Sequence, residues 1–204
     1  RGLPLADNCG LFSTKRLDNI IATIDDAWLH YSNLFIAQCE VTLPENFVAE
    51  SPCDIQFLVE RFSEAFSEEI QSDRRKTGTA NSRRPSTNIH FVWFYDLAGK
   101  PGGTIQLVIV VNGQSYFQLG PVTSLNRGLQ ELIPSGWGKI GQRVASTSGS
   151  LVIFPAEATY AIHGYGDGYG FKLSFQRLSE LCRVNLHEDN LSQPISGWGM
   201  VECR

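Results

Sequence analysis

The chain has 204 residues, of which 42% are hydrophobic and 11% aromatic, and this supplies enough apolar side chain for one well-packed core. Its formal net charge is −4, from 17 Lys and Arg against 21 Asp and Glu. That balance excludes a uniformly basic nucleic-acid-binding domain, although a local basic patch is still compatible with it.

The cysteines and the hydropathy of the chain exclude further classes. Five cysteines without a CxxC pair predict neither a zinc site nor a disulfide framework. No apolar run reaches transmembrane length and no signal-peptide pattern opens the chain. We therefore expect a cytoplasmic protein with reduced thiols and no membrane partner.

Periodicity predicts the elements in chain order. Residues 1–13 are aperiodic and predict a flexible lead-in, followed by a single domain over 14–204. Apolar residues at helical or strand spacing predict a helix at 14–31, a strand at 33–43, a helix at 51–72, strands at 88–96 and 104–112, a helix at 124–137, a strand at 150–154 and a helix at 171–184. The basic segment 73–84 predicts a loop, 164–170 a Gly-rich turn and the tail after 184 irregular structure.

The predicted order of the central elements is strand, helix, strand, strand, helix, strand. This order indicates an α+β fold with a ferredoxin-like split β-α-β core, an antiparallel sheet and flanking helices. The strand at 104–112 is almost wholly apolar after Gln106, which predicts a central strand covered on both faces. Folds of this kind serve many functions, so the function has to come from particular residues.

Seven segments carry a more specific signal through their order and spacing. They are DDAW at 25–28, QCEV at 38–41, IHFVWFYD at 89–96, LVIVVNGQSYFQLG at 107–120, GSLVIFP at 149–155, FQRLSELCR at 175–183 and GWGMVECR at 197–204. Together they resemble the inovirus-type replication protein family, which includes the YagK/YfjJ C-terminal domain proteins of bacterial prophages. The resemblance covers residues 15–204.

The resemblance implies an HUH-endonuclease fold and a DNA-nicking activity. In that class, a His-hydrophobic-His pair on a central strand holds a divalent metal, and a helical tyrosine forms a covalent link to the 5′ phosphate. Here the two histidines fall on Thr104 and Gln106, the tyrosine on Glu180 and a motif lysine on Arg183. The resemblance therefore implies a retained scaffold whose catalytic positions are degenerate, with no metal and no cofactor.

The segment 74–84 is the candidate DNA contact. Five positive charges in eleven residues could grip several phosphates, or could simply keep a solvated loop soluble. The residues are Arg74, Arg75, Lys76, Arg83 and Arg84.

Three hypotheses about function follow. The first is a catalytically inactive relative of rolling-circle initiators, from a prophage or other mobile element, that binds single-stranded or origin-like DNA or a protein partner. The second is an active nicking enzyme with a rearranged site, in which Asp96, Glu180 and a tyrosine such as Tyr165 or Tyr169 surround a divalent metal. The third is a protein-interaction module without a nucleic-acid role.

Overall fold

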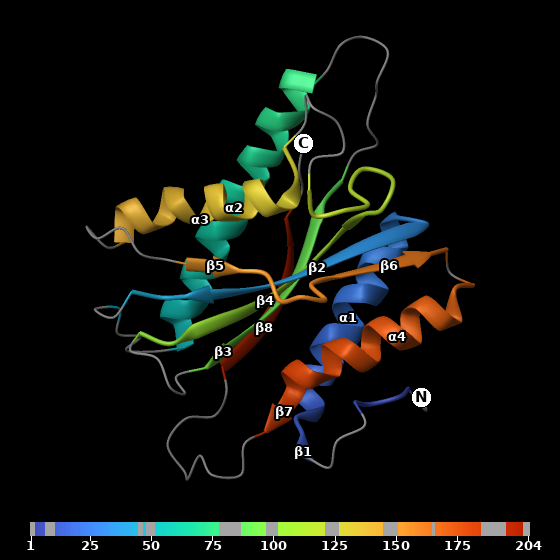
Figure 1. The fold of residues 1–204 in the computed structure, drawn as a ribbon. Helices are drawn as coiled ribbons and strands as arrows, with labels where there is room; N and C mark the ends of the chain where they lie inside the picture. The colour runs from blue at the N-terminus through green and yellow to red at the C-terminus, as the bar shows by residue number, and fades with distance from the viewer. Residues whose placement is uncertain are drawn as a thin grey trace.

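One antiparallel sheet forms the middle of the protein, with helices on both of its faces (Figure 1). The computed structural model describes residues 3–6, 11–44, 47, 52–77, 87–96, 102–120, 127–144, 151–164, 166–184 and 195–201. The elements are β1 (Leu11–Phe12), α1 (Thr14–His30), β2 (Asn33–Thr42), α2 (Pro52–Thr77), β3 (Ile89–Asp96), β4 (Thr104–Asn112), α3 (Leu129–Val144), β5 (Leu151–Ile153), β6 (Thr159–His163), α4 (Gly168–Ser179), the 3-10 turn η1 (Glu180–Cys182), β7 (Arg183–Val184) and β8 (Ile195–Val201).

The strands of the main sheet lie in the order β5-β2-β4-β3-β8, and β6 pairs with β2 beside β5. All neighbours are antiparallel. The chain crosses β4 when α2 connects β2 to β3, and it crosses β2 when α3 connects β4 to β5. The predicted α+β class with an antiparallel sheet is confirmed, and β4 is central as expected.

Side chains of successive strand residues point to opposite faces, and this alternation divides the core into two. On one face, residues such as Phe35, Trp93 and Leu107 pack against α2 and α3. On the other face, residues such as Ile36 and Val108 pack against α1 and α4. The sheet is therefore the middle layer of three. Each polar residue on a central strand faces either α2 and α3 or α1 and α4, depending on its place in the alternation.

Several boundaries differ from those predicted. Helix α2 continues to Thr77, so the loop prediction is wrong for residues 73–77, while 78–86 lie outside the described residues. Helix α3 ends at Val144 rather than near 137, and α4 begins at Gly168 within the predicted turn. The tail holds the strand β8, and neither it nor β6 is predicted from the sequence.

The N-terminal segment contacts the rest of the chain at two places. Strand β1 pairs antiparallel with β7. The backbone N–H of Ala6 donates to Ser179 Oγ at 3.0 Å. These contacts attach the start of the chain to the end of α4.

Among the helices in the described ranges, none is long and apolar enough to cross a membrane.

Candidate functional site

Thr104 and Gln106, the positions that the resemblance assigns to metal ligands, lie near the start of β4. They are two residues apart, so both face the side of the sheet that α1 and α4 cover. Thr104 is buried at 7% exposure and Gln106 is half-buried. The strand therefore presents two neutral side chains where the nicking class has two imidazoles.

Cross-strand neighbours surround these two residues with further polar groups. The register places Glu40 of β2 opposite Gln106, and Thr42 opposite Thr104. On the other side of β4, Asp96 of β3 lies opposite Thr104. Gln106 Nε2 donates to Glu40 Oε2 at 2.8 Å, which is a charge-assisted hydrogen bond. The amide of Gln106 is thus engaged by a carboxylate of the neighbouring strand.

Glu180 and Arg183, the other two positions from the resemblance, lie where α4 ends. Glu180 opens η1 and Arg183 opens β7. Their side chains form a two-point ion pair, with Arg183 Nε 2.7 Å from Glu180 Oε2 and Nη2 donating to Oε1 at 2.9 Å. The Arg183 guanidinium also lies 5.9 Å from the centroid of the Phe12 ring. The pair compensates the negative charge of Glu180.

Arg16 of α1 contacts both β3 and η1, and it is not among the site residues predicted from the sequence. Its guanidinium carbon lies 5.2 Å from the centroid of the Phe94 ring, and Phe94 is the cross-strand neighbour of Gln106. Its Nη1 donates to the carbonyl oxygen of Leu181 in η1 at 3.0 Å. A signal was present, because Arg16 occupies the buried stripe of α1 that Ile20 and Ile24 continue.

Within the described ranges, no three His, Cys, Asp or Glu side chains lie close enough to hold a metal ion. Tyr169 is 79% exposed in the first turn of α4. It is eleven residues from Glu180, which corresponds to about 16 Å along a helix. Tyr165 lies outside the described residues.

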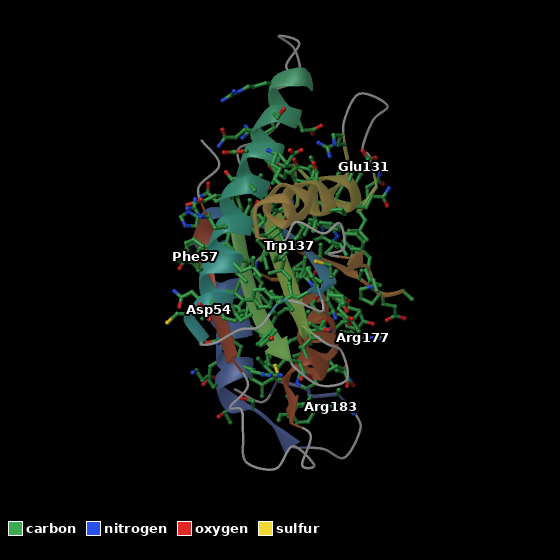
Figure 2. All side chains as sticks on the ribbon, turned by 90° about the vertical axis from the view of Figure 1, so that its left-hand side faces the viewer. Asp54, Phe57, Glu131, Trp137, Arg177 and Arg183 are labelled. Carbon is green, nitrogen blue, oxygen red and sulfur yellow. The ribbon has the colours of Figure 1, made fainter. Side chains whose placement is uncertain are left out.

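Three of the five basic residues predicted to contact DNA lie at the opposite end of the molecule from η1 and β7. Arg74, Arg75 and Lys76 belong to the end of α2, while Arg83 and Arg84 lie outside the described residues. Figure 1 shows the end of α2 projecting beyond the sheet, at the opposite end of the molecule from η1 and β7. Figure 2 shows the same separation, with Arg177 and Arg183 at the far end from the tip of α2.

Acidic side chains next to this basic end are compensated by residues on and before α3. Glu69 forms ion pairs with Arg127 and with Lys139, whose Nζ is 2.9 Å from Glu69 Oε1. Burial alone would raise the pKa of Glu69, but the hydrogen bonds from Lys139 and Arg127 outweigh it and hold this pKa below its ordinary value. Asp73 accepts a hydrogen bond from the backbone N–H of Arg127 at 2.9 Å. The last turn of α2 carries Arg74, Arg75 and Lys76 in succession.

The fold is that of an α+β domain. A polar site lies near the start of the central strand β4, and the basic end of α2 projects beyond the sheet. A comparison with protein families makes the assignment more specific. Residues 5–194 match the YagK/YfjJ C-terminal domain family, and the chain belongs to that family. Comparisons with curated proteins and with solved structures return no match.

Proposed function

We propose that this protein is a non-cutting relative of rolling-circle replication initiators that binds DNA through the basic end of α2. The proposal rests on the side chains at the four positions that the resemblance assigns to catalysis, Thr104 and Gln106 on β4 and Glu180 and Arg183 after α4. Gln106 is hydrogen-bonded to Glu40, and Glu180 is paired with Arg183. Groups engaged with one another in this way supply neither two metal ligands nor a nucleophile.

DNA contact is assigned to the other end of the molecule because cations gather there. Arg75 is exposed, and Arg74 and Lys76 belong to the same helical turn. Arg83 and Arg84 follow within a few residues in the sequence. Lysines and arginines that neutralise phosphates release counterions, so the proposal predicts binding that weakens as salt rises.

The binding arm of the test measures the affinity for labelled oligonucleotides by fluorescence anisotropy across a salt series. Arg74→Gln/Arg75→Gln removes two charges and keeps the side-chain length. We expect the slope of log affinity against log salt to fall by about 1.5. The control, Lys15→Ala/Arg61→Ala, removes two exposed charges elsewhere and should leave the slope unchanged. Wild-type protein that fails to bind DNA even at low salt would contradict the proposal and favour a protein-interaction module.

A second experiment tests for cutting: the protein is incubated with single-stranded and supercoiled DNA in Mg²⁺ or Mn²⁺. We expect neither a nicked circle nor a protein–DNA adduct. A covalent 5′ adduct would overturn the non-cutting assignment and favour the rearranged site with Asp96, Glu180 and a tyrosine. Replacing Tyr165 and Tyr169 by Phe, one at a time, would then identify the nucleophile.

A further inference from the structure

An exposed aromatic side chain lies just past the end of the central strand β4. Phe117 is 56% exposed, although Ser115 and Tyr116 directly before it are buried. Residues 113–120, which we call the β4 loop, contain no charged side chain. The loop therefore presents an apolar ring to the solvent, without an acidic group of its own that would repel a phosphate.

The β4 loop is fixed on both sides of this ring. Before it, the backbone N–H groups of Ser115 and Tyr116 donate to the carbonyl oxygen of Asn112, at 2.9 and 3.0 Å. After it, the carbonyl oxygen of Leu119 accepts from the backbone N–H of Gln130 at 3.0 Å, and Leu119 packs against the core. A group that is already held in place loses little conformational freedom when a ligand binds to it.

A series of contacts connects the β4 loop to the basic end of α2. Gly128 lies against Gly120 of the loop, and a Cβ added to Gly128 would be 2.2 Å from the carbonyl carbon of Gly120. Next to Gly128, the backbone N–H of Arg127 donates to Asp73, two residues before the exposed Arg75. Figure 1 shows the yellow-green β4 loop at the same end of the molecule as the tip of α2.

This end of the molecule is separate from the positions that the resemblance assigns to catalysis. Thr104 opens β4, whereas Phe117 follows the last residue of that strand, Asn112. The strand spans about 27 Å between its first and last residues. A role for Phe117 is therefore independent of the polar groups around Thr104.

We propose that Phe117 stacks on a base of single-stranded DNA whose neighbouring phosphates are held by Arg75 and the adjacent cations of α2. This inference rests on the proposed function and deepens it, because it names the form of DNA that is bound. The faces of bases inside a duplex are covered by neighbouring base pairs, so the ring meets only a base that is unstacked. Aromatic rings beside a basic surface are the combination that binds single strands without reading their sequence.

The first test compares a labelled dT oligonucleotide of about 15 nucleotides with the same strand annealed to its complement. We expect tighter binding of the single strand by fluorescence anisotropy. Phe117→Leu keeps an apolar side chain but removes the ring, so the single-strand affinity should fall by at least about fivefold. The slope of log affinity against log salt and the duplex affinity should stay unchanged, because no cation is removed.

Phe57→Leu is the matched control for this test. Phe57 is 57% exposed on the same helix that carries the basic end, but it lies about 27 Å along the helix from Arg75. Its replacement should leave the affinity for both forms of DNA unchanged.

The second test detects the stacking directly. One 2-aminopurine placed at the centre of the dT strand loses fluorescence when it stacks on an aromatic ring. At saturating protein, we expect the wild type and Phe117→Tyr to quench this fluorescence and Phe117→Leu not to quench it.

The outcomes separate this inference from the proposed function. Single-strand binding that is unchanged in Phe117→Leu, or quenching that persists in it, would overturn the role of Phe117. DNA binding through α2 would still stand in that case if Arg74→Gln/Arg75→Gln lowers the salt slope. Wild-type protein that binds neither form of DNA would overturn both.

Discussion

At the scale of single residues, one buried histidine lies on the face of the sheet that packs against α1. His90 of β3 is fully buried, and its Nδ1 lies 3.0 Å from Asp26 Oδ2. The rings of His30 and Tyr31 are its other neighbours, at 5.5 Å and 6.0 Å between centroids. Burial lowers the pKa of His90 below its ordinary value of 6.5, although the Asp26 carboxylate acts in the opposite direction.

This lowered pKa predicts that acid destabilises the protein. When the pH falls through 6.5, the histidine of the unfolded chain gains a proton while folded His90 stays neutral until its lower pKa is reached. The unfolded state then binds more protons, so the free energy of unfolding decreases with falling pH in that window. His90→Phe removes the group and should flatten this dependence in urea titrations between about pH 7 and about pH 5.5. His163→Gln, at an exposed position on β6, should leave it unchanged, and an equal slope in His90→Phe would disprove the assignment.

At the scale of elements, the packing of α3 on α2 depends on a glycine. Gly136 is buried, and a Cβ built there would lie 3.2 Å from Phe66 Cα and 3.3 Å from Phe62 Cε2. The neighbouring Trp137 stacks on Phe62 with ring centroids 4.6 Å apart, and Figure 2 shows it between the two helices. The contact with Phe66 is to backbone, so the helices would have to separate to admit a methyl group.

Two substitutions in α3 should therefore have opposite effects on stability. Gly136→Ala should lower the free energy of unfolding by about 1 kcal/mol, because overpacking outweighs the gain in helix propensity. A Cβ at Gly138 meets nothing within 4 Å, so Gly138→Ala should raise the free energy of unfolding by about 0.5–1 kcal/mol. Chemical denaturation of both variants provides the measurement. A stabilising Gly136→Ala would mean that α2 and α3 are not held at this distance.

The elements also show what the sequence could predict. Helices and strands with a long apolar period, such as α1 and β4, lie close to their predicted positions because burial on one or both faces demands that pattern. Strand β8 escaped prediction because its Gly-Trp-Gly centre is typical of a loop, and only pairing with β3 makes it a strand. The end of α2 was predicted as a loop from its polar composition, whereas buried Asp73 holds the backbone before α3. Tertiary contacts decided both cases.

The candidate site was predictable only in part, for the same reason. The resemblance located Thr104, Gln106, Glu180 and Arg183 along the chain, but not the residues with which they interact. Glu40 reaches Gln106 through strand register, and Arg16 reaches η1 from a helix more than 160 residues away in sequence. Contacts of that range are absent from periodicity and spacing. They pair Gln106 with Glu40 and bring Arg16 against Phe94 and Leu181.

At the scale of the whole molecule, the basic end of α2 and the polar residues of β4 lie on different layers. Helix α2 packs with α3 on one face of the sheet, whereas Thr104 and Gln106 face the side that α1 and α4 cover. The sheet between them is well buried, and β4 is covered on both faces. Changes at exposed residues of one layer should therefore leave the other layer intact, since distant sites with no shared contacts contribute additively.

This separation predicts that DNA binding does not depend on the polar residues after α4. Arg74→Gln/Arg75→Gln should weaken oligonucleotide binding. Glu180→Gln/Arg183→Gln removes both members of an ion pair at the other end of the molecule, so its affinity for the same oligonucleotide should match that of the wild type. Fluorescence anisotropy measures both affinities. An equal loss in the two variants would mean that the region after α4 also contacts DNA.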